Sequence, residues 1–388
     1  MDFFLFGSLP TLEQAQECVE QQKHRHKRKL LNFHNYPVYK WPMPIIYKYD
    51  GTHDADAILM IEAAIKHWET HTCIRFKRVD TNATLGIPVH ELGHAIGFWH
   101  EHVRPDRDNY VTVNSSYIYW WYRINYQKLN STLVNEMRVP YDYGSLLHYT
   151  ATELSIGRLH AIEPKDPLYL KTMGQRVGLS FFDAKLANLA YCKDACAGVK
   201  PIVKCYRGGY RDPNDCSKCK CPEGFGRVGC RYPERVEGGC SPKSQGFIYV
   251  HSTRERCLSS RNYDQADGKG RYKHGDKCNW LLKARWGRKI QVRFAGPRFS
   301  TYCYYDGPSC YQWVEIKYKK SLSLRGPRFC CNPGGIPNFN GKERLTSERR
   351  WMMIIFNAEY PLFMNKYSKT VPPHYMKGFK LCYRLAPL

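Results

Sequence analysis

Residues 90–101, which read His-Glu-Leu-Gly-His-Ala-Ile-Gly-Phe-Trp-His-Glu, constrain the fold of this chain more than any other segment. His90 and His94 are four positions apart, so a helix places both imidazoles on one face, within reach of one metal ion. Gly97 can adopt a left-handed backbone conformation, which ends the helix and lets the chain turn. The turn brings in His100 as a third ligand. Three protein ligands leave one coordination position open, as in a catalytic zinc site.

Glu91 follows the first histidine and is not needed as a ligand, so it can act as a base on a water molecule at the metal. Two histidines on a helix also fit a simple surface pair, or two core residues with satisfied hydrogen bonds. The added glycine and third histidine favour the metal site. The segment therefore predicts one Zn²⁺ per chain, held by His90, His94 and His100.

The cysteine content indicates an oxidising compartment. The chain has 388 residues, enough for two or three domains, and 17 cysteines, which predict a disulfide framework in a secreted, extracellular protein. No apolar run is long enough to span a bilayer. The apolar run within residues 1–6 is too short for a signal peptide, so we expect a chain that starts late. Three glycosylation sequons fit the same compartment, at Asn82, Asn114 and Asn130.

Positive charge is concentrated in the C-terminal part. Of the net charge of +24, residues 240–388 carry +19, from 28 Lys and Arg against 9 Asp and Glu. A solvated basic surface would account for this charge. In a secreted protein it also predicts attraction to acidic matrix polysaccharides or other anionic surfaces. No nucleic-acid recognition motif is present, so nucleic acid is not expected as a partner.

Three segments together resemble the astacin family of zinc metalloendopeptidases, within the metzincins. They are residues 90–101, residues 104–111 (Arg-Pro-Asp-Arg-Asp-Asn-Tyr-Val) and residues 141–149 (Tyr-Asp-Tyr-Gly-Ser-Leu-Leu-His-Tyr). The resemblance implies an α+β fold with a two-lobed metzincin catalytic domain. A small disulfide-rich EGF-like module and an all-β CUB-like sandwich would follow it.

The resemblance also assigns roles to residues outside the zinc motif. Tyr149 would be the tyrosine that stabilises the oxyanion of the reaction, beside Glu91 as general acid and base. Leu147 stands where the family has a methionine beneath the zinc. Because Leu and Met have similar volumes, we expect this exchange to cost less than about 1.5 kcal/mol. Glu101 would pair with the amino group that propeptide cleavage releases.

Four segments are expected on these grounds. The basic cluster that ends at Arg28 is typical of a processing site, so residues 1–28 would be a truncated propeptide. The protease domain would span 29–195, the EGF-like module 196–231 and the CUB-like region 240–388. The resemblance implies four disulfides, Cys73–Cys192, Cys196–Cys216, Cys205–Cys219 and Cys221–Cys230. The eight cysteines of the last segment exceed the usual four, and their pairing stays open.

Hydrophobic periodicity adds local elements. Residues 40–49 and 73–76 predict strands, and the spacing of Ile58, Ile61, Ile65 and Trp68 predicts a helix over 55–70. Residues 183–192 resemble the closing helix of the catalytic domain. In the C-terminal part, residues 289–294 and 351–356 predict buried strands.

The chain departs from the astacin pattern between Cys73 and His90, which only 16 residues separate. The family has a longer segment there, with an edge strand that pairs with the substrate. Three functions therefore stay open. The first is a secreted zinc endopeptidase that acts on extracellular-matrix or cuticle-type proteins. The second is a catalytically impaired binding protein that uses its EGF-like and CUB-like modules. The third is the product of an incorrectly assembled transcript, which does not fold stably.

Overall fold

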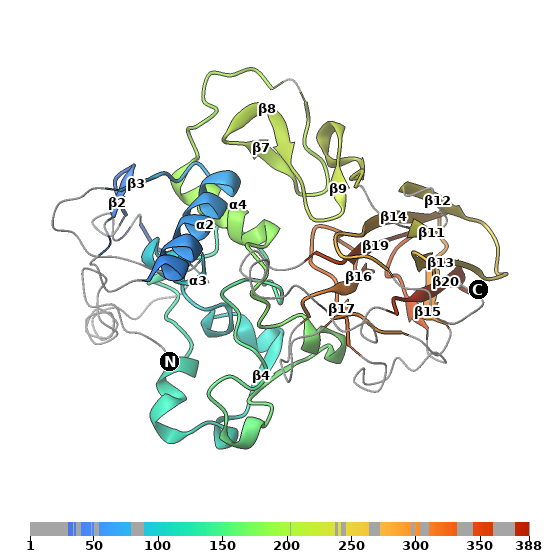
Figure 1. Ribbon diagram of the computed structural model, residues 1–388, viewed down its shortest axis with the longest axis horizontal. Helices are drawn as coiled ribbons and strands as arrows, with labels where there is room; N and C mark the ends of the chain where they lie inside the picture. The colour runs from blue at the N-terminus through green and yellow to red at the C-terminus, as the bar shows by residue number, and fades with distance from the viewer. Residues whose placement is uncertain are drawn as a thin grey trace. The chain divides into compact units, whose positions relative to one another are not determined.

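The computed structural model describes most of the chain as two compact units, unit 1 and unit 2 (Figure 1). Unit 1 comprises residues 1–141, 145–165 and 182–194, and unit 2 comprises 142–144, 166–181 and 195–388. No helix among the described residues is long and apolar enough to cross a membrane. The described residues are 30–33, 35, 40–47, 49, 54–78, 89–201, 203–236, 240–241, 246–263, 272–295, 299–302, 310–331, 344–359 and 377–387.

A strand, a helix and a second strand follow one another in unit 1. Strands β2 (Ile45–Tyr47) and β3 (Phe76–Arg78) pair in parallel, and helix α2 (Ala55–His71) connects them. Asp54 caps the helix by accepting a hydrogen bond from the backbone N–H of Ala57 at 2.7 Å. The predicted apolar face is confirmed: Ile61, Ile65 and Trp68 are buried and Ile58 packs against them.

The strand predicted over 73–76 is displaced in the structure, because β3 begins only at the last of these residues, Phe76. The Arg75 carbonyl accepts a hydrogen bond from the Ile45 N–H of β2 at 2.8 Å, whereas the groups before it make local hydrogen bonds. The Thr72 hydroxyl accepts a hydrogen bond from Ile74 N–H at 3.1 Å, and the Arg75 guanidinium donates to the carbonyl of Thr72 at 3.0 Å. Cys73 is tied by its disulfide to Cys192. The segment is therefore a capped turn at the end of α2.

The rest of unit 1 holds two short helices and two strand pairs. Helix α3 (Val89–Ala95) lies beside α2, which is blue in Figure 1. Helix α4 (Phe181–Tyr191) ends next to Cys192, so the Cys73–Cys192 disulfide joins the ends of α2 and α4. The antiparallel pairs are β1 (Leu30–Leu31) with β5 (Val134–Asn135), and β4 (Val111–Val113) with β6 (Ile162–Pro164).

Unit 2 contains a small module held together by disulfides. The three pairings Cys196–Cys216, Cys205–Cys219 and Cys221–Cys230 are confirmed. So few residues bury little apolar surface, and the disulfides supply the missing stability. Its strands form two antiparallel pairs, β7 (Tyr210–Asp212) with β8 (Asp215–Lys220), and β9 (Phe225–Gly226) with β10 (Tyr232–Pro233).

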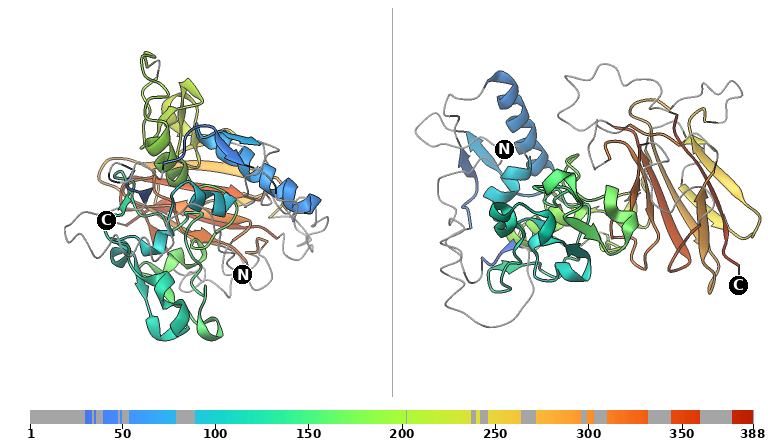
Figure 2. Two further views of the ribbon diagram at one scale, coloured as in Figure 1. Left: turned by 90° about the vertical axis from the view of Figure 1, so that its left-hand side faces the viewer. Right: turned by 90° about the horizontal axis from the view of Figure 1, so that it is seen from below.

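Two five-stranded sheets make up the rest of unit 2, and their strands run side by side in two layers (Figure 2). All neighbours pair antiparallel except β12 and β14. One sheet has the order β11 (Cys240–Ser241), β13 (Arg256–Ser260), β20 (Lys380–Leu385), β15 (Ile290–Phe294) and β18 (Leu345–Thr346). The other has the order β12 (Gly246–Val250), β14 (Lys277–Ala284), β19 (Trp351–Asn357), β16 (Trp313–Lys317) and β17 (Arg328–Phe329).

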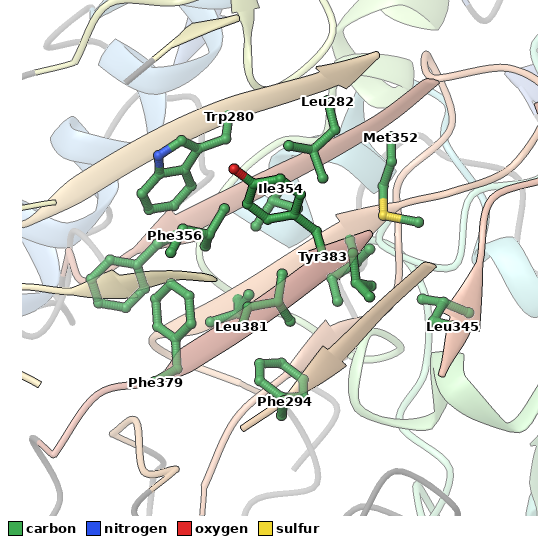
Figure 3. Close-up of a cluster of buried hydrophobic side chains, with 14 of the residues drawn as sticks. Trp280, Leu282, Phe294, Leu345, Met352, Ile354, Phe356, Phe379, Leu381 and Tyr383 are labelled. Atoms are coloured by element: carbon green, nitrogen blue, oxygen red, sulfur yellow. The ribbon is translucent and has the colours of Figure 1, made fainter. Parts of the chain in front are cut away.

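The core of this sandwich fills the space between the two sheets. Trp280 and Ile354 point inward from one sheet, and Leu381 and Tyr383 point toward them from the other (Figure 3). The alternation of β15, with Ile290, Val292 and Phe294 buried, matches the predicted strand. Disulfides Cys257–Cys382 and Cys310–Cys330 settle two pairings that the sequence left open.

Residues 166–181 pack in unit 2, although the sequence places them within the protease segment. The Tyr169 hydroxyl donates a hydrogen bond to the carbonyl of Arg325 at 3.2 Å, and the Arg328 backbone N–H donates to the Thr172 hydroxyl at 2.9 Å. These hydrogen bonds are between residues more than 150 positions apart, so no local pattern predicts them.

Candidate metal centre

The three predicted ligands converge on one point. The Nε2 atom of His94 lies 3.2 Å from that of His90 and 3.1 Å from that of His100, and the Nε2 atoms of His90 and His100 are 3.3 Å apart. Nitrogens bound to a tetrahedral zinc at about 2.0–2.1 Å would lie about 3.3 Å from one another. The spacing therefore suits one ion shared by three imidazoles. Within the described residues, this is the only such cluster of three His, Cys, Asp or Glu side chains.

Backbone carbonyls set the tautomers of two of these imidazoles. His90 Nδ1 lies 2.8 Å from the carbonyl oxygen of Leu146, and His94 Nδ1 lies 2.7 Å from that of Phe98. A carbonyl only accepts, so each Nδ1 must carry a proton, and each neutral ring then has a lone pair on Nε2. Lone pairs that face each other at this distance repel unless a cation lies between them. The residues present therefore fit a bound metal.

Helix α3 and the turn after it present the ligands. Helix α3 is anchored at its first residue, where Trp68 of α2 donates a hydrogen bond from Nε1 to the carbonyl of Val89 at 3.0 Å. Gly97 has φ +96°, the left-handed conformation that the sequence predicts, and its N–H donates to the carbonyl of His94. Glu91 lies in the first turn of α3 and is half-buried.

Residues 145–149 form a buried turn that meets α3. Leu147 is fully buried, and a Cβ at Gly93 of α3 would lie only 3.2 Å from its side chain. The backbone carbonyl of Leu147 accepts a hydrogen bond from Glu101 N–H at 2.9 Å. Leu147 thus supplies an apolar floor against α3, as expected for a residue that replaces methionine at this position.

Asp183 of α4 holds this turn in place, a role that the sequence did not reveal. Its carboxylate accepts hydrogen bonds from the Ser145 hydroxyl at 2.7 Å and from the Leu146 backbone N–H at 2.8 Å. Leu146 in turn orients His90 through its carbonyl. Asp183 therefore acts on the candidate ligand through one intervening residue. An acidic residue in the first turn of a helix fits the helix dipole equally well, so its local sequence gives no sign of this role.

Tyr149 lies among aromatic rings beside the candidate ligands. Its ring centroid is 4.3 Å from that of His100 and 4.1 Å from that of His102. Burial, followed by the nearby His148, holds the pKa of His102 well below its usual range, so His102 is neutral. Burial, with Tyr149 next in effect, raises the pKa of Tyr126. His102 and Tyr126, whose rings lie beside Tyr149, are therefore both uncharged near neutral pH.

Glu101 is fully buried and pairs with Arg104, with 3.2 Å between Oε1 and Nη1. Arg104 also binds Asp106 and lies 3.9 Å from Glu136. Burial, together with the Asp106 and Glu101 carboxylates, raises the pKa of Glu136 to about 7 despite the nearby Arg104. The predicted pairing of Glu101 with a freed amino group stays a prediction, because residues 1–29 lie outside the described part.

Comparisons with known proteins bear on this site. Residues 33–85 and 80–192 match the model of the astacin peptidase family. The chain is 34% identical to zinc metalloproteinase dpy-31 of Brugia malayi, across 90% of this chain and 61% of that protein. It is 32% identical to zinc metalloproteinase dpy-31 of Haemonchus contortus, across 90% of this chain and 67% of that protein. Among solved structures, high choriolytic enzyme 1, a hatching enzyme zinc-protease of Oryzias latipes, matches with 28% identity and a TM-score of 0.37, across 43% of this chain and 98% of that one.

The chain belongs to the astacin family, since the Haemonchus contortus relative is 32% identical and two thirds of its length is covered. The chain spans about three fifths of the length of the Brugia malayi and Caenorhabditis elegans relatives named zinc metalloproteinase dpy-31. The family match falls into two segments that meet at residues 80–85. This is where the sequence suggests a shortened segment, most of which lies outside the described residues.

Proposed function

We propose that this chain is a secreted zinc metalloendopeptidase, with His90, His94 and His100 as ligands of one zinc ion. The observation that carries the proposal is the convergence of three Nε2 atoms within 3.1–3.3 Å, two of them deprotonated by carbonyl contacts at Nδ1. A fourth position is left for water or substrate, as catalytic zinc sites require.

The chemistry follows from the groups around this centre. When bound, zinc supplies Lewis-acid polarisation of a peptide carbonyl and makes water acidic enough to lose a proton near neutral pH. Glu91 would take that proton as the water attacks, and would then pass it to the leaving amine. The Tyr149 phenol would donate a hydrogen bond to the oxyanion as its charge develops.

The proposed substrates are extracellular-matrix or cuticle-type proteins. The disulfides of both units require an oxidising compartment, which supports secretion. Residues 1–28 would belong to a propeptide, 29–195 to the protease domain, 196–231 to an EGF-like module and 240–388 to a CUB-like region. The basic residues of the last segment would hold the enzyme near acidic matrix polysaccharides.

A second candidate is a binding protein with an impaired protease lobe. The two-part family match favours it, because a missing edge strand would weaken the grip on an extended substrate. The metal site would persist in this case, since its ligands come from α3 and the turn after it. Zinc content alone therefore does not distinguish the two candidates.

The test is zinc content and cleavage of quenched peptides by the full chain, beside Glu91→Gln. We expect one zinc per chain in both proteins, and turnover about 10²–10⁴-fold lower in the variant. Equal cleavage by the variant and the parent would overturn the assigned role of Glu91. A parent chain that binds one zinc and cleaves no peptide would favour the binding protein.

A matched control is Glu163→Gln, which removes a carboxylate from an exposed position on β6 of the same unit. This variant should keep both the zinc and the turnover of the parent. A loss of activity there would show that the assay responds to overall charge or folding.

A further inference from the structure

The C-terminal sandwich has a basic, aromatic recess at the end of strands β12 and β14, which lie side by side (Figure 1). Its volume is about 620 Å³. Tyr249 of β12 is opposite Lys283 of β14, and Lys283 is opposite Trp351 of β19, so their side chains lie on one face of the sheet. The turn after β14 adds further lining residues, among them Arg285, Trp286 and Arg288.

The outer face of this sheet is covered at one end and open at the other. At the covered end, Phe225 of the disulfide module packs against Leu281, Met353 and Ile355. At the open end, Tyr249 is 58% exposed and Trp286 is 81% exposed. Because both side chains line the same recess, they form contiguous exposed apolar surface, which commonly marks a binding site.

Four cations line the recess, namely Lys283, Arg285, Arg288 and Arg350, and its described lining contains no carboxylate. In the described part of the chain, no ion pair joins any of the four to an acidic side chain. Cations elsewhere in the same unit do pair, as Arg293 does with Glu255 at 2.7 Å. The recess therefore has an uncompensated positive potential, which would attract an anionic ligand.

Aromatic rings hold two of these cations in place. The Arg350 guanidinium lies 3.9 Å from the ring centroid of Trp286. The Lys283 ammonium lies 5.1 Å from the ring of Tyr249 and 4.9 Å from that of Trp351. Such contacts fix the position of the charge, so less entropy is lost when an anion binds.

We propose that this recess binds a short stretch of a sulfated polysaccharide. Sulfate groups would accept hydrogen bonds from Arg285, Arg288 and Arg350, and sugar rings would lie against the apolar faces of Trp286 and Tyr249. The volume suits a few sugar units rather than a flat lipid surface. The proposal identifies the residues that would bind the polysaccharide partner proposed above. Binding at this recess does not depend on peptide cleavage.

The test is calorimetric titration of the full chain with a heparin hexasaccharide, in 0.15 M salt. Trp286→Ala keeps the net charge and removes an exposed ring, so folding should be unaffected and affinity should fall at least about fivefold. In the double variant Lys283→Gln/Arg350→Gln, the affinity for the hexasaccharide should fall at least about tenfold. Cleavage of a short quenched peptide should stay at the level of the parent in both.

The matched control is Lys273→Gln/Lys320→Gln, which removes the same charge from two exposed lysines of the same unit outside the recess. If this control weakens binding as much as the recess variant, the attraction is a general charge effect and the proposal is wrong. Unchanged affinity in Trp286→Ala would also overturn it. A third contrary outcome concerns lipid. If phosphatidylserine vesicles bind through the same residues and the hexasaccharide does not bind, the proposal is also wrong.

Discussion

Two backbone carbonyls decide what the histidines of the metal centre can do. Leu146 and Phe98 each accept a hydrogen bond from an Nδ1 atom, and both ligand atoms are thereby kept deprotonated and aimed at His100. Partners of this kind raise metal affinity because the imidazoles need not reorient on binding. The residues that support the ligands should therefore matter nearly as much as the ligands.

Asp183→Asn tests this support. The amide would turn a donor group toward the Ser145 hydroxyl or the Leu146 N–H, so we expect the free energy of unfolding to fall by about 2–3 kcal/mol. Zinc affinity should fall about 10–100-fold, because the Leu146 carbonyl that orients His90 shifts. Urea unfolding and a competitive zinc titration measure the two effects. The exposed Asp194→Asn should change neither, and an Asp183→Asn chain with parental zinc affinity would contradict the positioning role.

The raised pKa of Glu136 predicts that the stability of the fold depends on pH. Its pKa is about 7 in the folded chain and 4.5 when unperturbed, so between these values the folded state holds the proton more tightly. Stability from this group is present below pH 4.5 and is lost as the pH rises toward 7. Glu136→Gln should therefore unfold like the parent at pH 4.5, but should be more stable at pH 8 by about 1 kcal/mol, since nearby charges and water screen the effect. Denaturant unfolding at the two pH values checks this, and a larger gain at pH 4.5 would have the wrong sign.

At the scale of elements, α3 carries two of the three proposed ligands, His90 and His94, but is only seven residues long. Isolated helices of this length are not stable in water, so tertiary contacts must hold α3 in place. Trp68 of α2 donates a hydrogen bond to the first residue of α3, and Trp41 donates one to the carbonyl of Ala95 at its end. Leu147 packs against the middle of the helix at Gly93.

Leu147 is the point at which this packing can be tested. Leu147→Met should lower the free energy of unfolding by less than about 1.5 kcal/mol, because the volume is nearly conserved. Leu147→Ala should lower it by about 2–5 kcal/mol, because a cavity opens beneath α3. Thermal and urea unfolding give both values, and the exposed Leu159→Ala serves as the control. If Leu147→Met were as unstable as Leu147→Ala, side-chain volume would not determine how well this residue packs against α3.

At the scale of the whole molecule, disulfides connect segments that are distant in the sequence. Cys73–Cys192 spans 119 residues and joins the ends of α2 and α4, and α4 is also the helix that carries Asp183. In the chain-entropy model, a cross-link of this span stabilises a fold by restricting its unfolded state.

Replacing both cysteines, in Cys73→Ser/Cys192→Ser, should therefore lower the stability of unit 1 by about 3–5 kcal/mol. Amide hydrogen exchange of α2 and α4 measures this locally and avoids the assumption that the entire chain unfolds in one step. The strands of the sandwich should keep their protection and serve as an internal control. Equal loss of protection in both units, or none in α2 and α4, would contradict the prediction.

The sequence alone predicted the metal chemistry, because ligand types and helical spacing are local properties. It predicted the three histidines, the turn at Gly97, the apolar face of α2 and, through the astacin resemblance, four disulfides. The strand expected over 73–76 begins only at Phe76, because Thr72 and Cys73 hold the residues before it in a local turn.

Only the tertiary structure decided how the site is supported. The hydrogen bonds of Asp183 to Ser145 and Leu146 link residues nearly 40 positions apart, and the row of Tyr249, Lys283 and Trp351 crosses three strands. Neither arrangement leaves a periodic trace in the sequence. The local pattern sets which atoms can bind a metal, whereas long-range packing sets where those atoms point.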